Sequence, residues 1–506
     1  MRAHLKVMAG ALAAALALAA GSVQAQTVRL GADVDAGTMD PRVMRDTTAY
    51  RVNNLLYDGL VQLDANLQPV PDLAASWENP EPTVWIFNLR EGVSFHDGST
   101  LTADDVVYTF ETILDPDLKA RFRSLFTPIE VIEAVDPLTV RIVLKEPYAP
   151  LLSYLDMGIV PKAYVEGGGD LSSAPVGTGP LKLDSWERGA KIVLVPFEGY
   201  FAGPPAIDRF EFVVVGDNTA RAQAFEAGDL DIIQSPLSPQ DISRLAADDR
   251  FASSISGGLG ITYLNMNVSD PLISDPALRR ALAALVDQDT IVNTIYEGVD
   301  QVAGSILLPS SWAYDAGITQ PAFDPAAAAA AFAEAGWSDT DGDGVLDKDG
   351  AALRLTLSTH SEDPNRIQAL EYIQAIFKQN GVDAAISIAD WPAFSAAVRG
   401  GQHQIALLGW LNIVDPDRLM FGQFHSAGTL NWGKYANAEV DGLLETGRAT
   451  IDAAGRTDAY RAAARIIASE LPYYVIAYQG YQVFHTDAVS LTPDARGMMR
   501  SAIGMQ

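Results

Sequence analysis

The side chains that most often carry catalysis are few and scattered in this chain. Beyond His4 no two histidines are three or four residues apart, the spacing that a metal site on one helix face needs. The patterns Gly-x-Ser-x-Gly, His-Glu-x-x-His and Gly-x(4)-Gly-Lys-Ser/Thr are absent. Because the chain has no cysteine, thiolate nucleophiles and thiolate metal sites are excluded. The sequence therefore gives little support to an enzyme.

One acidic loop matches the first half of a calcium-binding loop. Asp339, Asp341 and Asp343 hold positions 1, 3 and 5, and Gly344 holds position 6, so three carboxylates could wrap a hard cation. Position 12 is Gly350, where bidentate coordination needs Glu. Two interpretations stay open: a solvated turn, which the incomplete match favours, and a weak structural calcium site. No other metal and no cofactor is expected.

Trp410 and Asn412 are well suited to holding a small solute. An indole offers a flat apolar platform with one N–H donor, and an amide offers both a donor and an acceptor. A core tryptophan is the alternative for Trp410. Asp415 begins the run Asp415-Pro-Asp417-Arg418. It is either a ligand contact or part of a structural turn with an internal ion pair, and the turn is favoured.

Residues 85–106 give the clearest local structure. Apolar and polar residues alternate from Trp85 to Phe95, as in a half-buried strand, and Asp97-Gly98 marks a turn. Thr102, with Asp105 three residues later, forms a helix N-cap pattern. We therefore expect a strand, a turn and a capped helix.

Strands and helices alternate along the rest of the chain, which predicts an α/β fold. Helices are expected after Asp275-Pro276 and Asp324-Pro325, because an Asp cap followed by Pro at the first helical position favours a helix start. Further helices are expected at 364–380 and 456–470, and strands at 27–30, 139–144, 191–195 and 210–215.

Short motifs spread over nearly the whole chain carry a resemblance to a known family. They lie at 57–60, 71–77, 85–106, 177–180, 228–231, 264–267, 279–287 and 409–410. In this order they resemble the bacterial extracellular solute-binding proteins of family 5, which serve peptide, nickel and opine ABC importers. A single motif of this kind is weak, but the ordered series is specific.

The resemblance implies an α/β, two-lobed periplasmic-binding-protein fold (type II, cluster C), the Venus-flytrap architecture, with an extra domain inserted in lobe one. Residues 1–25 would be a signal peptide, 49–169 the inserted domain and 259–485 lobe two. Lobe one would comprise 26–48, 170–258 and 486–506. The hinge strands would cross near 258–263 and 483–488.

The resemblance also implies where a peptide's ends would be held. Dipeptide binders of the family grip the ammonium with an Asp three residues after Gly-Trp, and the carboxylate with an Arg before a lobe-two helix. Ile413 and His360 stand at these positions here. Both charged clamps are therefore expected to be absent, which disfavours free dipeptides, because a buried charge without a partner is costly. An imidazole at His360 would add a pH dependence near neutrality.

Further cleft candidates come from loops. Nickel-chelate binders of the family use arginines of the inserted domain, and the corresponding loop here contains Met157 and no arginine. Arg121 and Arg123 flank Phe122 and are candidates for holding an anionic group, with solvated surface arginines as the alternative. Trp312 lies in a loop that either covers the cleft or packs in the core.

The N-terminus and the charge indicate an exported protein. A basic start, an apolar run to Ala20 and small residues up to Ala25 are typical of a secretory signal peptide, and no lipid-anchor cysteine follows. The formal charge of -29 becomes -31 without Arg2 and Lys6, which disfavours nucleic acid and anionic lipid as partners. We expect a periplasmic monomer that is not lipid-anchored.

These observations predict a periplasmic solute-binding protein of an ABC importer. It would capture a peptide-like or other small polar solute between two lobes and deliver it to a permease heterodimer with cytoplasmic ATPases. One alternative keeps the fold with a non-peptide ligand, such as an opine, an amino-acid conjugate, a sugar or a metal chelate. Service to a chemoreceptor is another, and a periplasmic enzyme has the least support.

Overall fold

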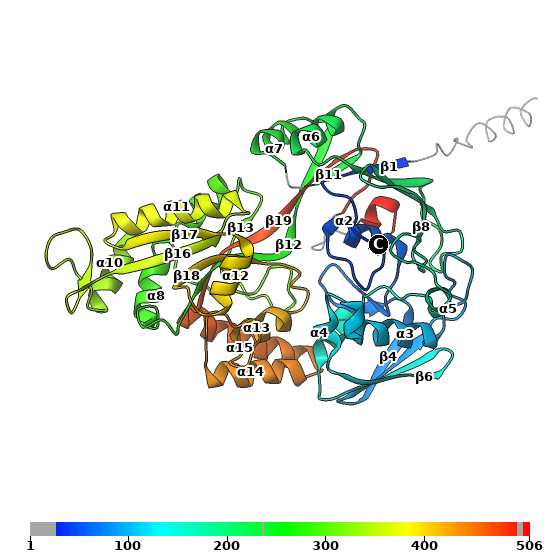
Figure 1. Cartoon of the computed structure of the whole chain (residues 1–506), viewed down its shortest axis with the longest axis horizontal. Helices are drawn as coiled ribbons and strands as arrows, with labels where there is room; N and C mark the ends of the chain where they lie inside the picture. The colour runs from blue at the N-terminus through cyan, green and yellow to red at the C-terminus, as the bar shows by residue number, and fades with distance from the viewer. Residues whose placement is uncertain (1–26, 235–236, 493–498, 506) are drawn as a thin grey trace, which may run out of the picture.

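Two long antiparallel strands, β12 (Phe251–Met266) and β19 (Tyr473–Thr486), run between two lobes in the computed structural model (Figure 1). The structure describes residues 27–234, 237–492 and 499–505, so the predicted signal peptide lies outside the described residues. The ladder between the two strands shifts register between Gly257 and Ile261, opposite Tyr478 to Gly480. This irregularity lies within the two strands that connect the lobes (Figure 1).

Both strands belong to an 11-stranded sheet with the order β17-β16-β18-β12-β19-β11-β1-β10-β9-β8 and with β13 beside β19. The lobe-one strands are β1 (Thr27–Ala32), β8 (Leu181–Glu187), β9 (Lys191–Pro196), β10 (Arg209–Val214) and β11 (Ile232–Gln234). The lobe-two strands are β13 (Gln301–Val302), β16 (Arg354–His360), β17 (Asp383–Ala389) and β18 (Ile405–Trp410).

Helices cover both faces of the lobe-two sheet. Alternate residues of β18 enter two different cores, with Ile405 and Leu407 in one and Ala406 and Leu408 in the other. A strand covered on both faces needs apolar residues at every position, as this strand has. The first core includes α8 (Pro276–Ala283), α10 (Pro325–Glu334) and α11 (Pro364–Gln379). The second includes α12 (Trp391–Arg399), α13 (Pro416–Phe424), α14 (Ala438–Ala449) and α15 (Ala453–Glu470).

Lobe one and the predicted inserted domain share one core, since Val28 and Leu30 of β1 belong to the same cluster as Phe87 and Phe110. The insert contains a four-stranded sheet in the order β4-β5-β7-β6, made of β4 (Ala74–Glu81), β5 (Val84–Leu89), β6 (Ile129–Asp136) and β7 (Thr139–Leu144). The helix α3 (Ala103–Leu114) packs against β6 and β7.

Shorter elements complete the described chain. They are α2 (Thr47–Leu56), β2 (Val61–Leu63), β3 (Pro69–Pro71), η1 (Pro116–Leu118), α4 (Arg123–Phe126), η2 (Ala149–Tyr154), α5 (Lys162–Glu166), α6 (Asn218–Glu226), α7 (Pro239–Ala246), α9 (Gln288–Thr290), η3 (Ile291–Ile295), β14 (Asp347–Lys348), β15 (Ala351–Ala352) and η4 (Arg500–Ile503). Within the described residues, no helix combines the length and the apolarity needed to cross a bilayer.

The local predictions from the sequence are largely confirmed. The Thr102 N–H donates to the Asp105 carboxylate at 2.9 Å, where α3 begins. The strand before it ends at Leu89 rather than Phe95, because the chain turns at Gly92, which has φ +75°. The register shift lies near the expected 258–263 crossing, but its partner segment on β19 precedes the expected 483–488. The domain boundaries themselves stay predictions.

Candidate functional site

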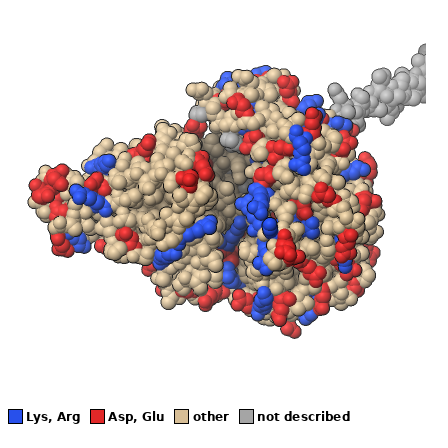
Figure 2. Space-filling model, in the orientation of Figure 1, with Lys and Arg blue, Asp and Glu red and all other residues tan. Residues whose placement is uncertain are grey.

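A cavity of about 260 Å³ lies between the lobes, and Figure 2 shows Lys and Arg side chains along the hollow that separates them. Its lining residues come from within 41–62, 121–126, 153–158 and 411–418, from Leu259 and Tyr481 on the two long strands, and from Asp72 and Arg500. The cavity is therefore built from parts of the chain that are hundreds of residues apart.

The helix α2 forms one wall. Asp46 caps its start, because one carboxylate oxygen accepts the Ala49 N–H at 2.7 Å. Tyr50, Asn53 and Asn54 then share the helix face that lines the cavity, as residues three and four apart do. Burial raises the pKa of Tyr50 to about 12, so its hydroxyl keeps the proton and can donate.

The loop after β18 forms the facing wall. Asn412 lines the cavity, as predicted, and has φ +58°, a left-handed conformation that Asn tolerates. Its carbonyl accepts an N–H of Arg418 at 2.9 Å, which holds the loop against α13. Ile413 is buried instead in a lobe-two core, and its N–H donates to the Leu259 carbonyl at 2.9 Å.

Asp415 is a fully buried structural residue. It caps α13 through the Asp417 N–H at 3.0 Å and forms an ion pair with Arg456 at 3.0 Å. The Ser153 hydroxyl, from the predicted inserted domain, donates to the same carboxylate at 2.9 Å. The interpretation as a structural turn is supported, but the ion-pair partner comes from α15 and not from Arg418. Asp415 thus joins the lobes at one edge of the cleft.

Neither predicted tryptophan is among the residues lining the cavity. Trp410 packs against Trp432 with ring centroids 6.4 Å apart, and its Nε1 has no hydrogen-bond partner among the described residues. The rings of Trp312 and Tyr460 meet edge-on with centroids 5.8 Å apart. The guanidinium carbon of Arg456 lies 4.8 Å from the centroid of the Trp312 ring. Core packing is therefore the better supported interpretation of Trp312, and a stacking role for Trp410 stays a prediction.

Lobe two supplies an arginine that the sequence did not indicate. Arg366 of α11 lies 2.9 Å from His360 Nε2 and 3.2 Å from the Asp363 carboxylate. It crosses directly over Gly409, where any Cβ would collide with the guanidinium. With Asp300 it lines a second hollow of about 250 Å³. The helix α11 thus brings an arginine to this side six residues after His360. The expected absence of a charged clamp at position 360 stays a prediction.

The pH dependence expected from His360 also changes. Burial and the neighbouring Arg366 charge lower the pKa of His360, so the imidazole stays neutral further into the acid range. His360 is buried beneath Arg366 and is not among the residues that line either hollow.

The two arginines beside Phe122 are separated by the start of α4. Arg121 lines the cavity together with Met157, and its guanidinium donates to the Arg45 carbonyl at 2.8 Å. Arg123 is not part of the lining, and its Nε donates to the Leu114 carbonyl at 2.7 Å. Of this predicted pair, only Arg121 is placed to meet a solute in the cavity.

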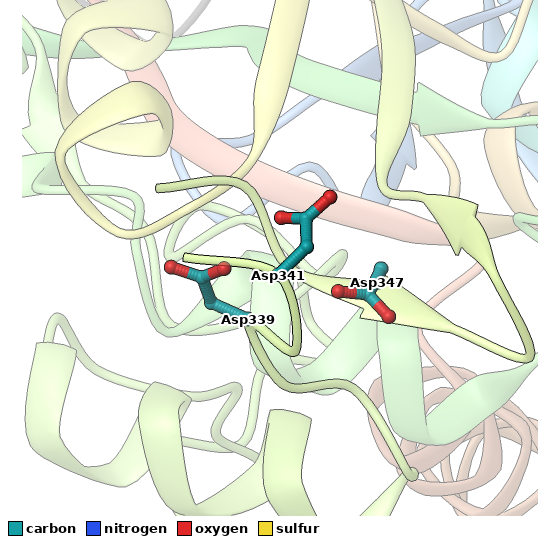
Figure 3. Close-up of side chains that lie close together, drawn as sticks. All are labelled: Asp339, Asp341 and Asp347. Atoms are coloured by element: carbon teal, nitrogen blue, oxygen red, sulfur yellow. The ribbon is translucent and has the colours of Figure 1, made fainter. Parts of the chain in front are cut away.

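The acidic loop gathers a different set of carboxylates from the one predicted. Asp339, Asp341 and Asp347 lie with carboxylate oxygens within 4.8 Å of one another, and Figure 3 shows these three side chains. Asp343 is outside this group and accepts a backbone N–H of the loop. Both oxygens of Asp339 accept backbone N–H groups, and those of Asp347 accept from Thr340. This bonding favours the solvated turn, and calcium binding stays a prediction.

Comparisons with known proteins agree with this geometry. A family model described as bacterial extracellular solute-binding proteins, family 5 Middle, matches residues 68–431. The dipeptide-binding protein of Escherichia coli (strain K12) is 29% identical over 494 residues, which cover 91% of this chain and 90% of that protein. Protein XP55 of Streptomyces lividans is 31% identical over 471 residues, which cover 90% and 84%.

A solved structure shares the architecture. It is the ABC transporter-associated periplasmic binding protein DppA from Helicobacter pylori in complex with the peptide STSA, with a TM-score of 0.74 and 25% identity over 94% of this chain and 97% of that chain. The two-lobed α/β fold expected from the sequence is thereby confirmed. The chain belongs to the bacterial extracellular solute-binding proteins of family 5.

Proposed function

We propose that this chain is the solute-binding component of an ABC importer, which captures a small polar or peptide-like solute between its lobes. The observation that carries the proposal is the inter-lobe cavity, whose lining comes from both sides of the cleft and from both hinge strands. A solute that touches both lobes binds the closed state more tightly than the open one, so binding drives closure. The closed form would then be recognised by a permease heterodimer with cytoplasmic ATPases.

The solute is proposed to leave the cavity chemically unchanged. Two of the relatives described above are binding proteins, for a dipeptide and for the peptide STSA. Asn412, Arg121 and Met157 are the proposed contacts among the predicted residues, since all three line the cavity. The protein is proposed to act as a periplasmic monomer without residues 1–25, which an intact-mass measurement of the exported protein would test.

Mass spectrometry of solute released from protein purified natively from the periplasm tests the proposed function. We expect a bound small molecule, and we expect small-angle scattering to show a smaller radius of gyration when stripped protein is reloaded with it. Conversion of that molecule to a product by the pure protein would contradict the proposal. So would reloading without compaction.

A further inference from the structure

Two arginines from opposite sides of the cavity meet at one aromatic ring. Arg121 lies in the loop before α4, and its guanidinium carbon is 5.5 Å from the centroid of Phe122. Arg418 lies on α13 in lobe two, and its guanidinium carbon is 5.4 Å from the same centroid. Both line the inter-lobe cavity. A solute in the cavity therefore meets a cation from each lobe.

Neither guanidinium forms an ion pair with a carboxylate in the described part of the chain. The hydrogen bond of each goes to a backbone carbonyl, from Arg121 to Arg45 and from Arg418 to Asn412. A guanidinium has five N–H donors, so most of them are left for other partners. Three other arginines near the cleft are paired instead: Arg448 with Asp417, Arg456 with Asp415 and Arg500 with Asp58.

The two positive charges oppose each other. Burial lowers the pKa of Arg418, and the charge of Arg121 lowers it further. Like charges brought together as lobes close cost free energy unless an opposite charge lies between them. The arrangement thus favours closure only when a negative group is present.

The carboxylates that line the cavity do not supply that negative group. One carboxylate oxygen of Asp46 accepts the Ala49 N–H, and the other accepts the Gly37 N–H. Burial and the nearby Asp58 charge raise the pKa of Asp72 well above its ordinary value, which favours the neutral form of this group. Asp156 already has a partner of its own.

Buried hydroxyls at the same place have no partner. The Tyr154 side chain is 5% exposed, and its hydroxyl has no hydrogen-bond partner among the described residues. The hydroxyl of Tyr50 also has no hydrogen-bond partner among the described residues, and the nearby charges of Arg121 and Arg418 both act to lower its pKa. Both tyrosines line the cavity, and neutral O–H groups form short, strong hydrogen bonds to anions.

We propose that the solute is an anion, and that Arg121 and Arg418 hold its carboxylate or phosphate group between the lobes with help from the hydroxyls of Tyr50 and Tyr154. The inference rests on the proposed function and names the chemical class of its solute. The anion takes the place of the missing carboxylate and couples binding to closure, because Arg121 and Arg418 stand on opposite walls.

The test compares matched charged and neutral probes. Calorimetry at constant ionic strength would use N-acetyl-dialanine against its C-terminal amide, succinate against succinamide, and inorganic phosphate. The proteins are the unaltered chain, Arg121→Gln, Arg418→Gln and the control Arg123→Gln, which removes an arginine two residues from Arg121 but outside the cavity. The relative affinities of the carboxylates and of phosphate distinguish the two anionic groups.

We expect at least one anion to bind roughly 10- to 100-fold more tightly than its neutral counterpart. A carboxylate is compared with its own amide, and phosphate is compared with both amides. Arg121→Gln and Arg418→Gln should each remove most of that preference, whereas Arg123→Gln should keep it. The absence of any preference for anions, or a preference that survives both substitutions, would overturn the inference. A neutral probe that binds and compacts the protein would overturn it while leaving the importer proposal standing.

Discussion

Asp415 and Arg418 are three residues apart in the sequence and have opposite surroundings. Asp415 is fully buried and bonded to Arg456 and Ser153, whereas the guanidinium of Arg418 bonds only to a backbone carbonyl in the described chain. A buried charge with several partners stabilises a fixed geometry, and one without a counter-charge is ready to meet a ligand. The same turn therefore serves both the fold and the proposed binding site.

Asp415→Ala is expected to destabilise the fold by about 3–5 kcal/mol, because Arg456 would remain buried without its carboxylate. Urea unfolding monitored by circular dichroism measures the change. Asp383→Ala, which removes an exposed pair with Arg354, is the control and should cost much less. Similar losses in the two variants would show that Asp415 does not join the lobes as described.

His96 should make the fold sensitive to acid. Its Nδ1 accepts the Gly177 N–H at 3.2 Å, so Nε2 carries the proton and donates to the Gly179 carbonyl at 3.0 Å. Burial lowers the pKa of His96 to about 4, below its ordinary value near 6.5. Between these values the unfolded chain binds a proton that the folded chain does not, so stability is full above about pH 6.5 and falls as the pH drops towards 4.

The contribution of His96 to this loss is of the order of 3 kcal/mol. His96→Gln removes the titrating group, so the free energy of unfolding of that variant should fall less between pH 7 and about pH 4.5 than that of the unaltered protein. Urea titrations at both pH values measure the two differences. Parallel pH profiles for the two proteins would contradict the assignment.

At the scale of elements, we expect the lobes to move relative to each other at the crossing of β12 and β19. Gly257 and Gly258 lie next to each other at the register shift, in different surroundings. A Cβ on Gly258 would lie 2.6 Å from the Gln479 carbonyl oxygen, whereas one on Gly257 would meet nothing within 4 Å. The close approach of the β12 and β19 backbones thus depends on Gly258 and not on Gly257.

Gly258→Ala is therefore expected to push the strands apart, to destabilise the protein by about 1–3 kcal/mol and to change the extent of closure. Gly257→Ala should leave both properties nearly unchanged. Thermal unfolding and small-angle scattering with and without the solute found by mass spectrometry measure the two effects. A Gly257 variant that behaves like the Gly258 variant would place the tight contact elsewhere.

At the scale of the whole molecule, the cavity links binding to stability. Its lining exists only in the folded chain, because it combines residues from within 41–62 with others from 411–418. A solute at one hundred times its dissociation constant should therefore add about 2.7 kcal/mol to the free energy of unfolding. Thermal unfolding over a solute concentration series measures this gain. A melting temperature that stays constant at saturating solute would contradict binding to the folded cleft.

The sequence by itself determined the local structure. The capping of α3 by Thr102 and Asp105, the starts of α8 and α10 at Asp-Pro pairs and the strand Thr139–Leu144 all depend on hydrogen bonds and backbone preferences within a few residues. The ordered motifs likewise indicate the family, because each of them is a short run of neighbouring residues. Such signals act over short distances along the chain, so one sequence is enough to interpret them.

Only the tertiary structure decided which side chains meet. Arg418 has no carboxylate partner among the described residues, because Asp415 and Asp417 pair with Arg456 and Arg448 from later helices. Arg121 and Arg123 lie in different surroundings because α4 begins at Arg123. Arg366 lies over Gly409 because α11 packs beside β16. Ion pairing and cavity lining depend on how distant elements pack against one another, and spacing along the chain carries no record of those distances.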